Sequence, residues 1–306
     1  MASEVLEQLR SMYRQTKEQN EAHPQSDEEL AASLPALRVQ NDEIIRQFIS
    51  VPEGVTVEEK VIGGRWGEYY RVDDSMPDKK KNSLILYIHG GGWENGSVVS
   101  RRFGTMTLAQ MAKTDCFSAE YTQWPEGRFD QGLAECLSVY SAFLDMGYES
   151  KNITLAGESA GGSMVLSMAL KLKEEGKPLP GHVVAYSPVT DLEDRFSSRE
   201  TLDALDPMIS ANVGRTMLKH YCDGQGAHDP IRCTRYGNFD GFPPTFIGVG
   251  SDEVLLDDSV DLAEKLKDAG IRHELRVYDG LYHTFMLVPA AESFECLKQT
   301  AAFIAE

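Results

Sequence analysis

The sequence predicts an α/β fold with a mostly parallel central sheet flanked by helices. From residue 84 onward, short apolar stretches rich in β-branched residues alternate with stretches of helical periodicity. This alternation is typical of parallel strands joined by helices that cover both faces of a sheet. The composition, 42% hydrophobic and 25% charged over 306 residues, agrees with one packed domain and some appended elements.

The first 50 residues are expected to form two helices that precede any strand. Apolar side chains recur at helical spacing from Val5 to Tyr13, and the pattern breaks at 22–24. Ser26 and Glu29 fit a capping box, in which each side chain accepts a hydrogen bond from the other residue's backbone N–H. We therefore divide the chain into an N-terminal helical cap segment at 1–50 and a main domain at 51–306.

Eight strands are expected after this segment. The first two, at 57–62 and 66–72, are separated by Gly63-Gly64 and should form a hairpin at an antiparallel edge of the sheet. The other strands are expected at 84–88, 116–121, 153–156, 183–187, 245–249 and 274–278, and helices at 129–146, 160–175, 257–269 and 290–305. Residues 192–235 interrupt the alternation with polar, glycine-rich sequence, which we interpret as a helical insertion that contributes to the cap.

Charge and cysteine content exclude several classes of function. Thirty basic and 48 acidic residues give a net charge of −18, which disfavours binding to nucleic acid or to anionic lipid. The five cysteines are scattered and form no C-x-x-C pair, so neither a disulfide framework nor a zinc site is expected. The first residues lack a signal-peptide pattern, and no stretch approaches the ~20 apolar residues of a membrane span. We expect a cytoplasmic protein that needs no metal or cofactor.

The most specific motif is G-x-S-x-G at 157–161, which directly follows the expected strand at 153–156 and begins a helix. In this setting the motif indicates a serine held on a sharp strand-to-helix turn, with its hydroxyl exposed at the carboxyl edge of the sheet. The N–H groups at the start of the helix would favour a developing negative charge. We therefore predict that Ser159 is a nucleophile.

A second motif, His89 followed by three glycines and Trp93, comes directly after the expected strand at 84–88. Consecutive glycines allow a backbone to approach another group closely. Here that group would be a substrate oxygen, and the N–H groups of Gly91, Gly92 and Ala160 would form an oxyanion hole.

A serine nucleophile needs a base and a carboxylate that orients the base. His283 follows the strand at 274–278 and is the candidate base, while Asp252 follows the strand at 245–249 and is the candidate acid. Their order along the chain, serine, acid, histidine, is that of the α/β-hydrolase fold. Asp257 and Asp258 remain alternatives, although acids at the start of a helix usually serve as caps.

Four aromatic residues are candidates for the wall of an acyl pocket, although side chains of this kind serve in core packing at least as often. They are Trp93, Trp124, Tyr282 and Phe285.

From about residue 55 to 306 the sequence resembles the bacterial hormone-sensitive-lipase-like esterases. The shared motifs lie at 89–93, 120–126, 157–162, 187–191, 252–257 and at His283. The resemblance implies the same triad and oxyanion donors, a cap made largely by the N-terminal helices, an acyl pocket suited to short chains, and often a homodimer. Two positions depart from the family pattern: Glu158 replaces a common aspartate, and Thr122 replaces a common arginine, which leaves local ion pairing and substrate preference open.

Together these features predict a serine carboxylesterase that hydrolyses short-chain acyl esters through an acyl-enzyme intermediate. An amide or formamide hydrolase and a small-sugar acetyl esterase could use the same triad. A non-catalytic ligand-binding module is a third alternative, because the plant gibberellin receptors resemble this family but lack the triad histidine. The presence of His283 argues against it. The physiological ester and the limit on chain length are left open.

Overall fold

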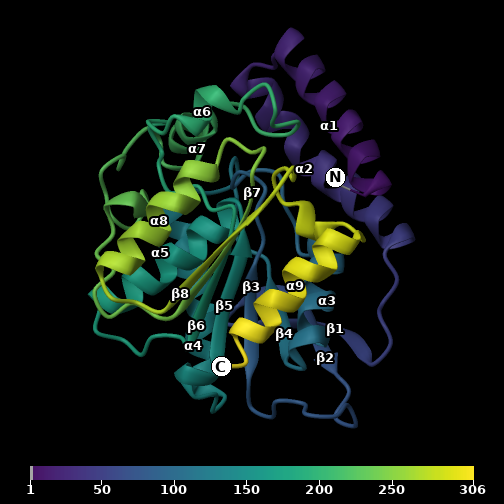
Figure 1. The fold of residues 1–306 in the computed structure, drawn as a ribbon, viewed down its shortest axis with the longest axis vertical. Coiled ribbons are helices and arrows are strands. Elements are labelled where there is room, and N and C mark those ends of the chain that lie inside the picture. The colour runs from purple at the N-terminus through teal and green to yellow at the C-terminus, as the bar shows by residue number, and fades with distance from the viewer. Residues whose placement is uncertain (1–2) are drawn as a thin grey trace.

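Eight strands form one sheet in a computed structural model that describes residues 3–306 (Figure 1). The strands are β1 Val55–Ile62, β2 Arg65–Val72, β3 Leu84–Ile88, β4 Asp115–Ala119, β5 Ile153–Glu158, β6 His182–Tyr186, β7 Thr245–Gly250 and β8 His273–Tyr278. Their order across the sheet is β1-β2-β4-β3-β5-β6-β7-β8. Only β2 runs antiparallel to its neighbours, so the predicted fold class is confirmed.

The predicted edge hairpin is present. β1 and β2 pair over their full lengths, and Ile62 lies opposite Arg65 across the turn. Gly63 and Gly64 have φ angles of +58° and +79°. A turn with two successive left-handed residues suits glycine and matches the twist of the two strands.

Helices cover both faces of the sheet (Figure 1). They are α3 Arg102–Ala112, α4 Phe129–Asp145, α5 Ala160–Glu174, α8 Leu256–Asp268 and α9 Ala291–Phe303. α3 and α9 pack on one face, and α4, α5 and α8 on the other. Alternate residues of β3 enter the two cores. Leu84, Leu86 and Ile88 lie on the face covered by α4, α5 and α8, whereas Ile85 and Tyr87 lie on the face covered by α3 and α9.

α3 is not among the helices predicted from the sequence. It contains Gly104 and two threonines, which have low helix propensity. Most of its residues are nevertheless buried, so the packing of α3 against the sheet and α9 stabilises a helix that its local sequence favours only weakly.

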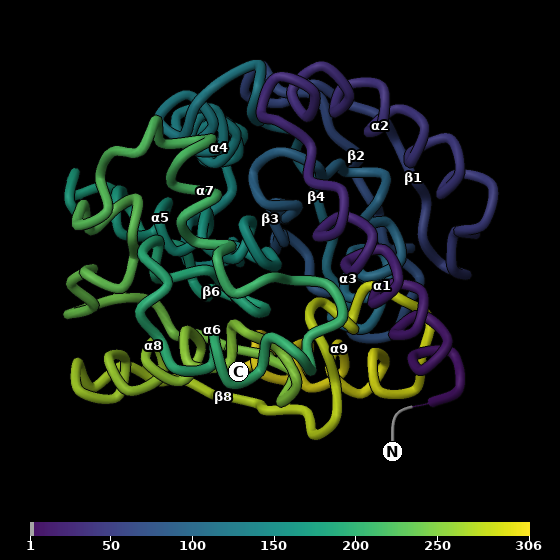
Figure 2. The backbone as a smooth tube through the Cα atoms, turned by 90° about the horizontal axis from the view of Figure 1, so that it is seen from above, coloured from purple at the N-terminus to yellow at the C-terminus, as the bar shows by residue number. Residues whose placement is uncertain are grey.

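The N-terminal segment forms two long helices, α1 Glu4–Ala22 and α2 Asp27–Phe48. The predicted capping box is present at the start of α2, since Ser26 Oγ accepts from Glu29 N–H and the Glu29 carboxylate accepts from Ser26 N–H. Seen from above, both helices lie across one end of the sheet (Figure 2). α2 is held there by a 2.7 Å ion pair between Arg38 and Glu126. No helix within residues 3–306 is long and apolar enough to cross a bilayer.

The segment at 192–235 connects β6 to β7 and is less helical than the sequence suggested. It contains only two short α-helices, α6 Ser198–Thr201 and α7 Val213–Tyr221, within largely irregular chain. The remaining helices are single 3₁₀ turns at Val99–Arg101, Ser150–Asn152, Thr234–Tyr236 and Phe285–Leu287.

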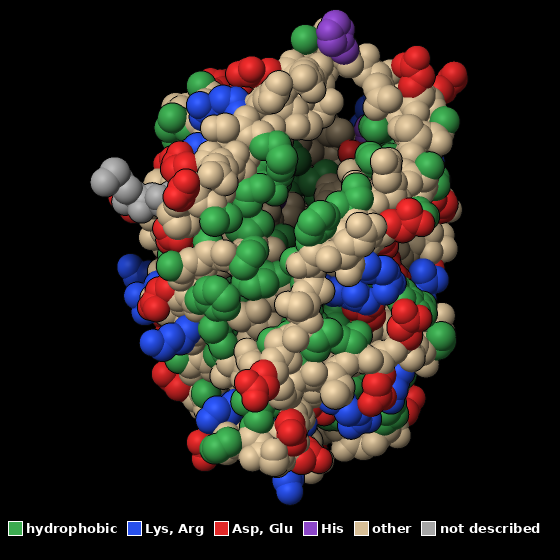
Figure 3. Space-filling view, turned by 90° about the vertical axis from the view of Figure 1, so that its right-hand side faces the viewer, with side chains coloured by type: hydrophobic (Ala, Val, Ile, Leu, Met, Phe, Trp, Pro, Cys, Tyr) green, Lys and Arg blue, Asp and Glu red, His purple; other side chains and the backbone are tan. Residues whose placement is uncertain are grey.

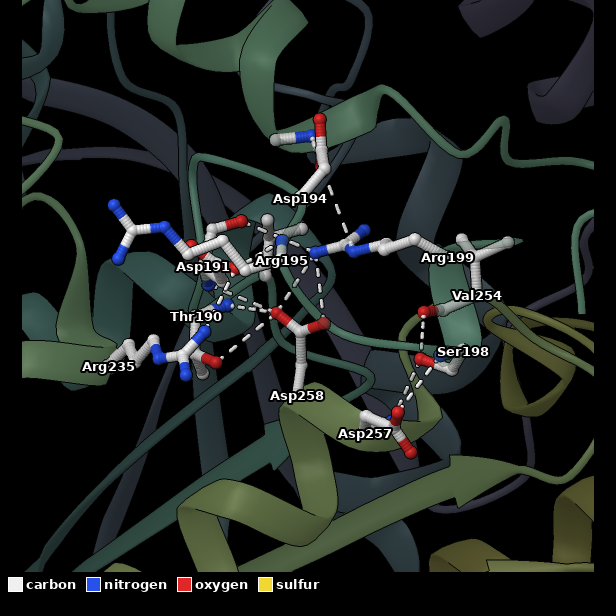
Figure 4. A network of polar contacts seen from close by, with 12 residues as sticks. Thr190, Asp191, Asp194, Arg195, Ser198, Arg199, Arg235, Val254, Asp257 and Asp258 are labelled. Carbon is white, nitrogen blue, oxygen red and sulfur yellow. Dashed lines mark hydrogen bonds and ion pairs between the residues drawn. The ribbon is translucent and has the colours of Figure 1, made fainter. Parts of the chain in front are cut away.

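A buried polar network holds this segment against α8 (Figure 4). At its centre Asp258 accepts hydrogen bonds from the N–H groups of Thr190 and Asp191, at 2.7 and 3.1 Å, and pairs with Arg199 at 2.9 Å. Burial raises the pKa of the Asp258 carboxyl to about 6, against the opposing effect of Arg199. Asp258 therefore fixes the position of the insertion, and it is fully engaged away from His283.

Candidate active site

Ser159 occupies the turn between β5 and α5. Its φ and ψ angles, +55° and −125°, lie in a strained region that costs about 1–3 kcal/mol for a residue with a side chain. The N–H of Ser159 donates to the carbonyl oxygen of Tyr186 in the neighbouring strand at 2.8 Å, which holds the turn in place. This is the sharp strand-to-helix turn that the G-x-S-x-G motif predicted.

Gly161, in the first turn of α5, has no room for a side chain. A Cβ atom on Gly161 would overlap the carbonyl oxygen of Ile88 and the backbone of His89. We expect Gly161→Ala to lower the free energy of unfolding by about 1–3 kcal/mol or more, because backbone atoms at the centre of the sheet cannot move aside. Chemical denaturation followed by circular dichroism would measure this loss.

A matched glycine in another helix provides the control. Gly104 of α3 would place its Cβ 2.9 Å from the flexible end of Leu287, which can shift. Gly104→Ala should therefore stay within about 1 kcal/mol of wild type, since alanine also has the better helix propensity. Equal losses in the two variants would contradict the close backbone contact at Gly161.

Residues 89–93, called the glycine loop below, lie directly beside Ser159. A Cβ atom on Gly90 would be 3.0 Å from the Cβ of Ser159, and Gly91 and Gly92 have φ angles of +108° and +67°. Within residues 3–306, the N–H groups of Gly91, Gly92 and Ala160 have no hydrogen-bond acceptor. Three unpaired backbone donors are therefore available at the predicted oxyanion hole.

The buried carboxylate of Glu158 holds the glycine loop in place. It is fully buried and accepts from Gly90 N–H at 2.6 Å, from Arg101 Nε at 2.5 Å and from the Tyr87 hydroxyl at 2.7 Å. The residue before Ser159 thus sets the position of the loop. Arg101, its cationic partner, was not singled out in the sequence because no local motif marks it.

His89 supports the same loop from the other side. Its Nδ1 lies 2.9 Å from the carbonyl oxygen of Gly90, and its ring stacks on Tyr121 with centroids 4.6 Å apart. Its Nε2 is 3.2 Å from Glu120. The imidazole of His89 is consequently engaged in positioning the loop.

In the loop after β8, His283 forms a hydrogen bond with Glu253. His283 Nδ1 lies 2.8 Å from Glu253 Oε2, and both side chains are buried. The other carboxylate oxygen accepts from Gly250 N–H at 2.5 Å and from Ser187 Oγ at 2.9 Å. Because a carboxylate can only accept, Nδ1 carries the proton, and Nε2 remains as the nitrogen that can exchange a proton.

The structure contradicts the prediction that Asp252 is the carboxylate bonded to His283. The Asp252 side chain points outward, to Arg10 Nη1 of α1 at 3.1 Å and to Ser251 Oγ at 2.9 Å. Its N–H is bonded to the carbonyl oxygen of Leu281, which fixes the turn so that the next side chain, and not this one, faces His283. Two adjacent carboxylates follow β7, and no sequence signal distinguished them.

Comparisons with known proteins identify the fold and the class of enzyme. A family model described as alpha/beta hydrolase fold matches residues 85–287. An esterase of Acinetobacter venetianus is 31% identical over 274 residues, covering 89% of this chain and 87% of the relative. An acetyl-hydrolase of Streptomyces hygroscopicus is 29% identical, covering 78% and 77%. The crystal structure of an esterase from the bacterial hormone-sensitive lipase family superposes with a TM-score of 0.86, at 25% identity and 99% and 98% coverage.

The chain belongs to the hormone-sensitive-lipase-like esterases of the α/β-hydrolase fold. It is a carboxylic ester hydrolase. The resemblance inferred from the motifs is thereby confirmed.

A cavity of about 440 Å³ in this esterase lies between helices α1 and α2 and the loops at the carboxyl edge of the sheet. Figure 3 shows this face of the molecule as hollowed, with hydrophobic side chains gathered along the hollow. The lining consists of Met12 and Tyr13 from α1, Asn41, Ile44 and Ile45 from α2, Ser100, Arg101, Met208, and residues 282–285, 287 and 288. His283 thus contacts the cavity, and so do Tyr282 and Phe285, two of the four predicted wall residues.

The other two predicted wall residues lie elsewhere. Trp93 is fully buried and packs against Phe129 and Tyr221, with ring centroids 5.2 and 5.3 Å away. Trp124 stacks on His220 at 4.4 Å. Neither lines the esterase's cavity, and both make the contacts of packing residues.

Ser159 is 7% exposed and is not itself on the cavity wall, and no hydrogen bond joins it to His283 in the described chain. In unliganded enzymes the contact between nucleophile and base is commonly long and tightens only when substrate binds.

Proposed function

We propose that this esterase hydrolyses short-chain acyl esters through an acyl-enzyme formed on Ser159. His283 acts as base and then as acid, and Glu253, in place of Asp252, orients the imidazole and stabilises its protonated form. The observation that carries the proposal is the buried 2.8 Å hydrogen bond between Glu253 and His283. It lies at the same carboxyl edge of the sheet as the strained turn at Ser159.

In the first half of the proposed reaction, Ser159 Oγ attacks the ester carbonyl while His283 Nε2 takes its proton. The negative charge that develops on the carbonyl oxygen is bound by the unpaired N–H groups of Gly91, Gly92 and Ala160. His283 then protonates the leaving alcohol. In the second half the same imidazole activates water, which releases the acid and restores Ser159.

We further propose that α1, α2 and residues 192–235 form the cap over this site. α1 reaches the insertion through Lys17, whose ammonium donates to the carbonyl oxygens of Asp203, Asp206 and Ile209 at 2.8, 3.1 and 2.9 Å. Such a cap excludes water and limits the size of the bound acyl group. The acetyl-hydrolase among the relatives supports a preference for short chains.

A series of p-nitrophenyl esters from acetate to laurate would test the chain-length part of the proposal. We expect kcat/KM to be highest at short chains and to fall by about tenfold or more toward laurate, because α1 and α2 line the cavity and a long acyl chain would have to displace their side chains. A maximum at laurate would contradict this expectation. Faster hydrolysis of matched aromatic amides than of esters would contradict the ester preference.

A further inference from the structure

Three hydrogen-bond donors around the cavity have no partner within the described residues 3–306. Arg101 uses Nε for Glu158 and Nη1 for Ser100 Oγ, at 2.5 and 2.9 Å, while its Nη2 bonds nothing within residues 3–306. In the same part of the chain, the hydroxyl of Tyr282 is buried without an acceptor. The hydroxyl of Tyr13 also has no hydrogen bond to any described residue. All three residues line the cavity that His283 contacts.

These donors lie close to one another. The rings of Tyr13 and Tyr282 meet edge to face, with centroids 5.9 Å apart. Arg101 lines the same cavity as these two tyrosines. Burial raises the pKa of the Tyr13 phenol, and the positive charge of Arg101 partly offsets that rise. The three residues thus line one cavity and not three separate ones.

Little of the remaining wall can accept a hydrogen bond, and Ser100 Oγ, one of its few acceptors, is already used by Arg101 Nη1. Most of the other lining side chains are hydrocarbon or thioether groups, namely Met12, Ile44, Ile45, Met208, Phe285, Leu287 and Val288. A buried donor without an acceptor, such as the Tyr282 hydroxyl, costs about 1–3 kcal/mol, so native proteins usually supply a partner from protein, water or ligand. A largely apolar pocket with a few convergent polar groups is also how proteins orient small ligands.

We propose that the preferred substrates of this esterase carry a second, neutral acceptor oxygen, a carbonyl or hydroxyl group, which Arg101, Tyr13 and Tyr282 bind. The inference rests on the proposed ester hydrolysis and specifies its substrate class. A neutral oxygen is favoured over a carboxylate because Glu158 already balances the charge of Arg101, and a second anion would face that buried carboxylate.

Matched ester pairs test this directly. Ethyl levulinate and ethyl pentanoate differ in having a ketone oxygen on the acyl chain. Butyl acetate and the acetate of the corresponding hydroxyketone place the oxygen on the alcohol instead. With hydrolysis followed by pH-stat, the wild type should favour the ketone ester by about tenfold or more in kcat/KM in one of the two pairs. Monoethyl succinate, which carries a carboxylate, should be hydrolysed more slowly than ethyl levulinate.

Two variants test whether the proposed donors cause the preference for the ketone ester. Arg101→Lys keeps a positive charge beside Glu158 but removes the terminal donor pair, and Tyr13→Phe removes one hydroxyl. Each should reduce the ratio of kcat/KM for the ketone ester over the plain ester several-fold. Because this ratio is taken within one variant, a general loss of activity cancels. Tyr236→Phe, which removes a hydroxyl that bonds Arg195 away from the cavity, should keep the wild-type ratio.

The proposal is overturned if the wild type shows no preference in either pair, if the succinate half-ester is the best substrate, or if both variants keep the wild-type ratio. Hydrolysis of ethyl pentanoate that depends on Ser159 would uphold the proposed function in each of these cases. The two proposals therefore fail separately.

Discussion

Ser159→Ala should lower kcat for p-nitrophenyl acetate by about 10⁴- to 10⁶-fold, because removing the nucleophile leaves only the contributions of binding and of the oxyanion hole. The protein should remain folded, since the Ser159 side chain takes no part in the bonds that hold the turn, which run through its backbone. Release of p-nitrophenol, measured with both proteins prepared in parallel, checks the rate. Circular dichroism checks the fold.

Ser138→Ala is the matched control for the loss of a hydroxyl. Ser138 lies in α4, and its exposed hydroxyl donates to the carbonyl oxygens of Gly63 and Glu135 far from His283. Its kcat should stay within about twofold of wild type, as expected for a surface substitution. A Ser159→Ala protein that kept more than about one per cent of wild-type kcat would exclude the acyl-enzyme mechanism.

Glu253→Gln should lower kcat by about 10³- to 10⁴-fold, the scale seen when the carboxylate of a triad becomes an amide. The amide cannot stabilise the imidazolium that forms at His283, and its NH₂ group favours the wrong tautomer. Steady-state kinetics with p-nitrophenyl butyrate measure the loss. The melting temperature shows whether the buried contacts to Gly250 and Ser187 survive.

The neighbouring substitution Asp252→Asn should lower kcat by less than about tenfold, since a weakened surface-side ion pair contributes about 1 kcal/mol or less. Its side chain is 23% exposed and contacts Arg10, and the asparagine oxygen can still accept a hydrogen bond from it. The two variants change the same atoms at adjacent positions. A larger loss in Asp252→Asn than in Glu253→Gln would restore Asp252 as the acid and refute the assignment of Glu253.

Much of the fold could be predicted because its signals are local. Most of the parallel strands are short apolar stretches buried on both faces, with β8 at the edge of the sheet as the partly exposed exception, and the strands from β3 to β8 were placed within a few residues. The same holds for the α2 capping box and for the edge hairpin, whose backbone requirements are met by Ser26, Glu29, Gly63 and Gly64. α3 escaped prediction because its stability comes from packing and not from helix propensity.

By itself, the sequence determined which segments meet at the carboxyl edge of the sheet, and it placed there Ser159, the glycine loop and His283. In each case a glycine or a strand-to-helix turn constrains the backbone, and those constraints can be read from neighbouring residues. Only the tertiary structure decided which side chains face inward. After β7 the backbone directs the Glu253 side chain to His283 and the Asp252 side chain to Arg10. Packing buries Trp93 in the core, while Arg101 lines the cavity. Side-chain direction in loops depends on contacts between segments far apart in the chain, and those contacts form only when the cap, the sheet and the insertion assemble.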